Sequence, residues 1–122
     1  MKTKAGGLFP FVPSGERYEE AIEFFAELGF AKAWGDENMA GLRFGNAYFI
    51  LQNINIPVWQ ENQMLTYEVD NLDQYWEELF IKNLQERFEG VKLNPPSEVS
   101  WGGREISIID LGGVCWHIRQ GE

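Results

Sequence analysis

Cysteine and histidine are scarce in this sequence. Its 122 residues include one cysteine, Cys115, and one histidine, His117. A single cysteine excludes an internal disulfide framework, and a catalytic zinc, iron or manganese site needs about three or four His, Cys, Asp or Glu side chains around one point. We therefore expect neither a metal nor another cofactor.

Long apolar runs are missing as well. The longest apolar segments, such as 47–51, are far too short to cross a bilayer. No cationic segment followed by an apolar run opens the chain, as an export signal would. Together with the single cysteine, these absences predict a cytoplasmic protein without a membrane partner.

Basic residues are outnumbered by acidic ones. Ten Lys and Arg stand against nineteen Asp and Glu, which gives a net charge of -9. Such a charge repels phosphate backbones and concentrates cations near the surface, so we do not expect nucleic acid as a partner. A cationic small molecule fits better, although an acidic surface that only maintains solubility explains the composition equally well.

Apolar and aromatic residues are plentiful by contrast. They make up 44% and 15% of the chain, enough for a hydrophobic core, and the length suits a single domain over residues 1–122. Five tryptophans are present, and such flat rings often line clefts for flat ligands. We expect Trp76 and Trp116 in the core, and Trp34, Trp59 and Trp101 near a ligand.

One order of elements occurs twice along the chain. In the first half, apolar periodicity predicts a helix over 18–28 that Gly29 closes. Alternation and turn residues predict strands over 8–12, 30–34, 39–44 and 47–52. A linker without regular structure follows, where Pro57 argues against a strand.

The second half repeats this order. The pattern predicts a helix from residue 72 through 88, closed by Gly90, and a loop at Pro95 and Pro96. The predicted strands are 63–69, 91–93, 99–101, 105–110 and 114–119. The repeat indicates an internal duplication, with module one over 7–53, a linker over 54–62 and module two over 63–120. The predicted fold class is α+β: two βαβββ modules whose paired curved sheets enclose a cleft.

Cys115 and His117 lie two residues apart on one predicted strand, so their side chains share a face. Such a pair could supply two metal ligands, or a nucleophile and its base. A strand interior, however, lacks the helix N-terminus and the cations that usually lower a thiol pKa. We favour the interpretation that both residues are neutral and line a core or a pocket.

Several motifs resemble those of one family. Residues 100–106 (SWGGREI) and 110–118 (DLGGVCWHI) resemble the closing signature of bleomycin-resistance proteins, a Trp-Gly-Arg-Glu-Phe strand followed by Asp-Pro-x-Gly-Asn-Cys-x-His. Residues 23–25 with 28–30 resemble the family's helix ending, and residues 39–42 resemble its next strand. The likeness covers nearly the whole chain and places it in the glyoxalase, or vicinal oxygen chelate, superfamily.

The resemblance implies a metal-free homodimer that sequesters a planar, cationic, drug-like ligand in a cleft at the subunit interface, as an antibiotic-resistance protein does. It also implies that Pro10 is the hinge of an N-terminal strand exchanged between subunits. The implied ligand-binding residues are aromatic and apolar walls (Trp34, Trp101, Met39), acidic groups (Asp36, Glu37, Glu61), hydrogen-bonding groups (Gln52, Asn62, Thr66), and further candidates Trp59, Gly102, Arg104, Cys115 and His117.

The superfamily also contains metal enzymes, and this leaves two alternatives. Its metal ligands would fall near Gly7, Phe49 or Leu51, Met64 and His117, of which at most one can ligate. The first alternative is a metal-dependent lyase, dioxygenase or thiol transferase with His117 as an off-pattern ligand. The second is an interaction module that keeps only the fold.

Overall fold

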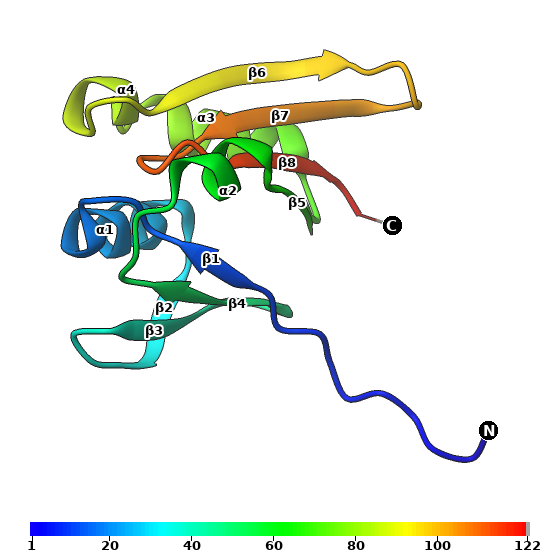
Figure 1. Ribbon diagram of the computed structural model, residues 1–122. Helices are drawn as coiled ribbons and strands as arrows, with labels where there is room; N and C mark the ends of the chain where they lie inside the picture. Colours follow the sequence, from blue (N-terminus) through cyan, green and yellow to red (C-terminus); the bar gives the residue numbers. More distant parts are fainter. Residues whose placement is uncertain (122) are drawn as a thin grey trace.

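The computed structural model describes residues 1–121 (Figure 1). It contains two four-stranded sheets, one from each half of the chain. In both sheets the first pair of strands is parallel and the other pairs are antiparallel. Sheet A contains, in spatial order, β1 (Phe11–Pro13), β4 (Ala47–Gln52), β3 (Met39–Phe44) and β2 (Ala31–Gly35). Sheet B contains β5 (Met64–Val69), β8 (Cys115–Gln120), β7 (Arg104–Ile109) and β6 (Lys92–Glu98). The identical order confirms the predicted fold of two βαβββ modules.

The described residues also form four helices: α1 (Tyr18–Leu28), α2 (Pro57–Asn62), α3 (Leu72–Phe80) and α4 (Leu84–Arg87). Helix α1 matches its predicted bounds. It ends because Gly29 adopts φ 113°, a left-handed conformation that side chains disfavour. No helix among the described residues is long and apolar enough to cross a membrane.

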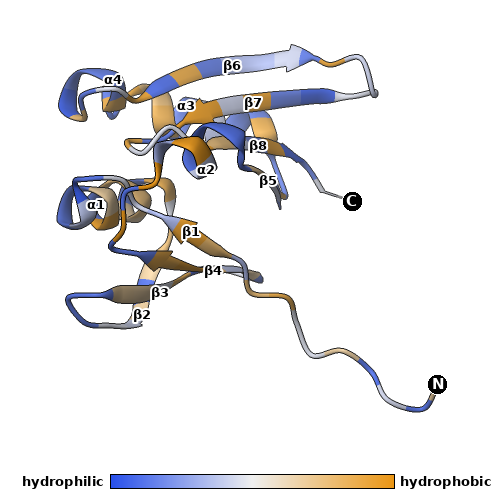
Figure 2. Ribbon diagram, in the orientation of Figure 1, coloured by the Kyte–Doolittle hydropathy of each residue, from blue (hydrophilic) through white to orange (hydrophobic). Residues whose placement is uncertain are grey.

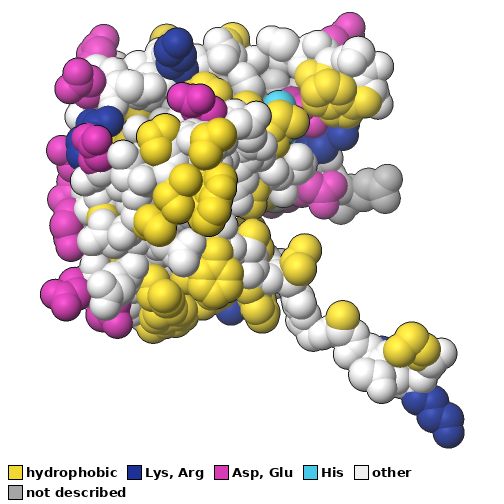
Figure 3. Space-filling view, in the orientation of Figure 1, with side chains coloured by type: hydrophobic (Ala, Val, Ile, Leu, Met, Phe, Trp, Pro, Cys, Tyr) yellow, Lys and Arg dark blue, Asp and Glu magenta, His cyan; other side chains and the backbone are white. Residues whose placement is uncertain are grey.

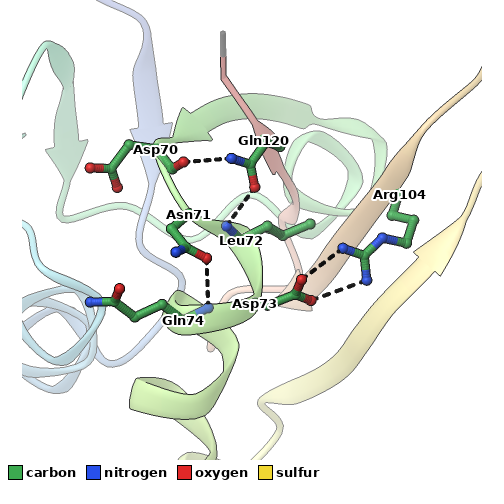
Figure 4. Close-up of polar contacts among 7 residues, drawn as sticks. All are labelled: Asp70, Asn71, Leu72, Asp73, Gln74, Arg104 and Gln120. Carbon is green, nitrogen blue, oxygen red and sulfur yellow. Dashed lines mark hydrogen bonds and ion pairs between the residues drawn. The ribbon is translucent and has the colours of Figure 1, made fainter.

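The start of α3 is fixed by polar contacts shown in Figure 4. The Asn71 side chain caps the helix by accepting the Gln74 N–H. The Gln120 side chain accepts the Leu72 N–H and donates to the Asp70 carbonyl, so the end of β8 is tied to the same helix.

The two sheets share one hydrophobic core. Phe25 of α1 packs against both Phe49 of sheet A and Trp116 of sheet B, and those two rings lie 4.9 Å apart between centroids. Apolar residues occupy most of β1, β3 and β4, as the colouring in Figure 2 shows. We call the core-facing side of each sheet its inner face and the opposite side its outer face. The inner faces carry Val12, Ala40, Leu42, Phe49 and Leu51 in sheet A, and Tyr67, Ile106, Ile108, Trp116 and Ile118 in sheet B.

The turn between β7 and β8 crosses onto the first module. The buried Asp110 carboxylate organises this turn by accepting the N–H groups of Gly112 and Val114 and the indole N–H of Trp116. At the crossing, a Cβ on Gly15 would lie 2.9 Å from the Gly112 Cα. The modules therefore meet backbone to backbone.

Two segments of the second half differ from prediction. The prolines 95 and 96 do not form a loop, because β6 runs through them as an edge strand with a register shift between Asn94 and Ser97. Edge strands and bulges are where a sheet tolerates proline. The predicted strand over 99–101 is wrong, since β6 ends at Glu98 and a turn follows.

The long helix predicted over 72–88 is also wrong. Helix α3 ends at Phe80, and α4 starts only after Asn83, whose φ of 54° is left-handed. The apolar periodicity continues across the break, which is why the sequence pattern hides it. Trp116 is buried as expected, whereas Trp76 is only partly buried against the core.

The linker and the N-terminus differ as well. The segment 54–62, expected to lack regular structure, contains α2, which starts at Pro57, a favoured first residue of a helix. The strand predicted over 8–12 is displaced to Phe11–Pro13. Residues 1–10 form an extended arm (Figure 1), in which the Phe9 ring packs on Tyr48 and the Pro10 carbonyl accepts the Ile50 N–H.

Candidate functional site

The outer face of sheet A carries an aromatic wall formed by Trp34, Gly41 and Tyr48. The Trp34 indole N–H donates to the Tyr48 hydroxyl, and 43% of Trp34 is exposed. Gly41 makes this possible, because a Cβ there would lie 2.2 Å from the indole nitrogen. The Arg43 guanidinium lies 4.7 Å from the Tyr48 ring centroid. A flat ring with a fixed tilt is a surface on which a planar group can stack.

Tyr48 was not among the predicted site residues. Strand alternation puts it on the same face as Gln52, but only the register, in which Arg43 pairs with Tyr48 and Met39 with Gln52, brings it to Trp34. The same register places Met39 and Gln52 side by side at the other end of β3 and β4.

The outer face of sheet B carries a polar cluster around one buried carboxylate. The Glu105 side chain is 3% exposed, and its Oε2 accepts the Trp101 indole N–H at 3.2 Å and lies 3.4 Å from Arg119 Nε. Its Oε1 lies 3.2 Å from His117 Nδ1. Trp101 itself is 62% exposed and meets the His117 ring edge to face. Glu105, Trp101, His117 and Arg119 are called the Glu105 cluster.

Sequence reasoning also missed Glu105 as a site residue. The available signal was an acidic residue inside an otherwise apolar strand, since a buried carboxylate needs partners. Cys115 adjoins the cluster, with its Sγ 3.5 Å from His117 Nε2. Gly102 contributes through its carbonyl, which accepts from Arg119.

A shallow groove of about 640 Å³ lies where α2 meets β1, and we call it the α2 groove. Figure 3 shows hydrophobic side chains gathered over this region. The groove brings together three of the predicted residues, Gln52, Trp59 and Asn62. Its other lining residues are Phe11, Pro13, Val58 and Gln63.

A second hollow of about 950 Å³ lies between the modules, along β5 and the first half of β4. Of the predicted residues it contains only Thr66 and Pro10. Thr66 pairs with His117 in the ladder, so it also belongs to the outer face of sheet B.

Several predicted polar residues lie apart from these surfaces. The Asp36 carboxylate accepts the N–H groups of Asn38 and Met39, and these bonds lower its pKa. Asp36 therefore shapes the turn between β2 and β3. Glu37, in the same turn, accepts the Asn53 amide through its carbonyl.

Arg104 and Glu61 also lie away from the two clusters. Arg104 forms a two-bond ion pair with Asp73 of α3, so it points to the helix side of sheet B (Figure 4). Glu61 is an exposed residue of α2.

The predicted residues thus fall mainly on two separate surfaces. Trp34, Met39 and Gln52 belong to the outer face of sheet A, whereas Thr66, Cys115 and His117 belong to that of sheet B. Because the inner faces pack on one shared core, the two outer faces do not face each other within the chain.

The residues at the superfamily's metal positions do not fit a divalent metal. Phe49 and Leu51 are buried on the inner face, Gly7 has no side chain, and Met64 offers only a thioether. Among residues 1–121, no three His, Cys, Asp or Glu side chains are grouped to hold a metal ion.

Comparison with proteins of known structure identifies the fold. No protein-family profile and no curated protein matches the sequence. A bleomycin-binding protein in complex with bleomycin is similar over 97% of this chain and 100% of its own, with a TM-score of 0.82 and 20% identity. The bleomycin-binding protein of Streptomyces verticillus in complex with copper(II)-bleomycin is similar over 98% and 99%, with a TM-score of 0.79 and 24% identity.

The likeness extends to the wider superfamily. A member of the glyoxalase/bleomycin resistance protein/dioxygenase superfamily from Sphaerobacter thermophilus is similar over 95% of this chain and 98% of its own, with a TM-score of 0.62 and 17% identity. The resemblance inferred from the sequence motifs is confirmed for the fold: this chain has the fold of the bleomycin-binding proteins and of the glyoxalase/bleomycin resistance/dioxygenase superfamily.

Proposed function

We propose that this chain is a homodimeric binding protein that sequesters a planar, cationic, drug-like molecule without changing it chemically. The proposal rests on one observation: the candidate site is divided between the outer faces of the two sheets. Each outer face presents an exposed tryptophan, Trp34 on sheet A and Trp101 beside sheet B. In a two-fold dimer, the outer face of sheet A of each copy lies over the outer face of sheet B of the other copy. Two equivalent clefts then form, each between the Trp34 of one copy and the Trp101 of the other.

The chemistry of the two faces favours a flat ligand with positive charge. The aromatic wall offers one stacking surface, and Trp101 offers another whose indole is held by Glu105. The net charge of -9 draws cations toward either face. In the turn between β2 and β3, Asp36 and Glu37 add further negative charge.

The bleomycin complexes of two proteins with this fold support the ligand class. We propose accordingly that the chain binds a bleomycin-like compound in the cytoplasm and so confers resistance. The ends of the cleft would be lined by Met39, Gln52, Trp59, Asn62 and Thr66. Three of these residues, Gln52, Trp59 and Asn62, also line the α2 groove.

Titration with copper(II)-bleomycin, followed by calorimetry, tests the proposal. We expect saturable binding of one ligand per chain at micromolar drug. Trp101→Ala should weaken binding about tenfold or more, because exposed aromatic anchors carry much of the energy of such sites.

Trp76→Ala is the matched control. It removes the same type of side chain from α3, which packs on the inner face of sheet B, so binding should change less than about twofold. Thermal unfolding of both variants verifies that each is folded. Absence of heat with the wild-type protein would rule out the drug, and equal losses in both variants would rule out the site.

A further inference from the structure

Three side chains on the outer face of sheet B form a line whose combined chemistry reversible binding does not require. The Cys115 Sγ lies 3.5 Å from His117 Nε2, and His117 Nδ1 lies 3.2 Å from Glu105 Oε1. A thiol, an imidazole and a carboxylate in this order are the parts of a nucleophile, its base and the group that orients the base.

The carboxylate is set up to orient the imidazole. Glu105 Oε2 accepts the Trp101 indole N–H and lies 3.4 Å from Arg119 Nε, whereas no donor among the described residues makes a well-aligned hydrogen bond to Oε1. Such a buried, unpaired oxygen is costly, and the nearest nitrogen is His117 Nδ1. When Nδ1 carries the proton of the neutral imidazole, the lone pair is on Nε2, which lies 3.5 Å from the thiol sulfur.

The thiol depends on such a base. Burial raises the pKa of Cys115, and the carboxylates of Asp110 and Glu105 raise it further. Without assistance, Cys115 is therefore protonated at neutral pH and reacts more slowly than an ordinary thiol. Cys115 is nevertheless only partly buried.

We propose that Cys115, His117 and Glu105 form a base-assisted thiol site that adds to soft electrophiles such as α,β-unsaturated carbonyl compounds. His117 Nε2 takes the thiol proton as the sulfur attacks the β-carbon and forms the S–C bond. The π electrons of the C=C bond move to the α-carbon and carbonyl as an enolate, which then takes the proton from His117. The net change is addition of S–H across the double bond, with no oxidant or reductant.

The rate of reaction with N-ethylmaleimide tests the site, with mass spectrometry to locate the adduct. At pH 7 the native chain should react about tenfold or more faster than the same chain unfolded in urea, because a positioned base accelerates proton transfer by at least that factor. Cys115→Ser should form no adduct. His117→Ala should lose the acceleration, and added imidazole should restore part of it.

Two further comparisons separate positioning from packing. Glu105→Gln keeps an acceptor oxygen for His117 and should retain the rate within about threefold, whereas Glu105→Leu should lose it. Ser107→Ala changes a neighbouring side chain outside the line and should have no effect. A native thiol slower than the unfolded one, or a rate that His117→Ala leaves unchanged or raises, would overturn the proposal, and neither result bears on reversible drug binding.

Discussion

Asp110 is the residue whose surroundings most alter its chemistry. Burial raises its pKa to about 6, although hydrogen bonds from Trp116, Val114 and Gly112 oppose the shift. The folded protein therefore holds this proton more tightly than the unfolded chain, whose carboxyl has an ordinary pKa near 3.8. The contribution of Asp110 to stability is greatest at low pH and falls as the pH rises from about 4 to about 6.

Comparison with Asp110→Asn isolates this effect. With about 1.4 kcal/mol for each pKa unit, the wild-type protein should lose up to about 3 kcal/mol relative to the variant between pH 4 and pH 7. Urea unfolding of both proteins across this range measures the difference, in which the other carboxyl groups cancel. Parallel stability curves would show that Asp110 does not titrate in this window.

Single residues also show where sequence reasoning stops. Trp34 and Trp101 could be singled out as exposed because each adjoins a turn, and both are indeed partly exposed. Tyr48 and Glu105 could not be joined to them, since their contacts cross between strands or around a turn and depend on register. Nothing in the sequence indicates that the absence of a side chain at Gly41 leaves the space that the Trp34 ring occupies.

At the scale of elements, the break between α3 and α4 depends on one backbone conformation. Asn83 has φ 54°, which asparagine tolerates better than other residues with a side chain. Asn83→Ala should lower the free energy of unfolding by about 1 kcal/mol, because alanine is strained there. Urea unfolding measures the change.

Asn83→Gly is the control for this prediction. Glycine adopts the same conformation without strain, so its stability should lie within about 0.5 kcal/mol of the wild type, with unfolded-state entropy offsetting the relief. An alanine variant as stable as the glycine variant would mean that the two helices are continuous in solution.

Elements with clear periodicity were predictable, and those set by competing rules were not. Helix α1 and strands β3 and β4 match their predicted bounds because apolar spacing and turn residues agree there. Strand β6 was misread because proline usually ends a strand, and only its position at the edge of sheet B makes proline acceptable. Which strand lies at an edge is decided by the tertiary structure.

At the scale of the whole molecule, the N-terminal arm gives the dimer proposal a direct test. Strand β1 is three residues long and pairs with residues 50–52 of β4, so residues 47–49 have no strand partner on that edge within 1–121. The arm carries exposed Leu8 and Phe9 next to this edge, and Pro10 connects it to β1. An arm exchanged at Pro10 can cover the same edge in the second copy.

Deletion of residues 1–9 should therefore weaken the dimer at least about tenfold, because exchanged strands supply both backbone hydrogen bonds and apolar contacts. Sedimentation velocity across a concentration series measures the monomer–dimer equilibrium. Deletion of residues 1–5, which leaves Leu8 and Phe9 in place, should have little effect. A wild-type protein of single-chain mass at all concentrations would contradict the dimer.

The duplicated fold was predictable, but the placement of the site across it was not. Two βαβββ repeats follow from the order of elements. The order of elements predicts that paired sheets enclose a cleft, but only the resemblance of the motifs implies that the cleft lies between two chains. The shared core of Phe25, Phe49 and Trp116 turns the outer faces away from each other.

The contact between Gly15 and Gly112 bears on how a duplicated gene of this kind can diverge. A methyl group at Gly15 would lie 2.9 Å from the Gly112 backbone, and one at Gly112 would lie 2.8 Å from the Ser14 carbonyl oxygen. Backbone cannot yield as a flexible side chain can, so neither position accepts even alanine unless the modules move apart. Descendants of such a gene can vary their outer faces, and with them their ligands, while the junction of the two modules stays fixed.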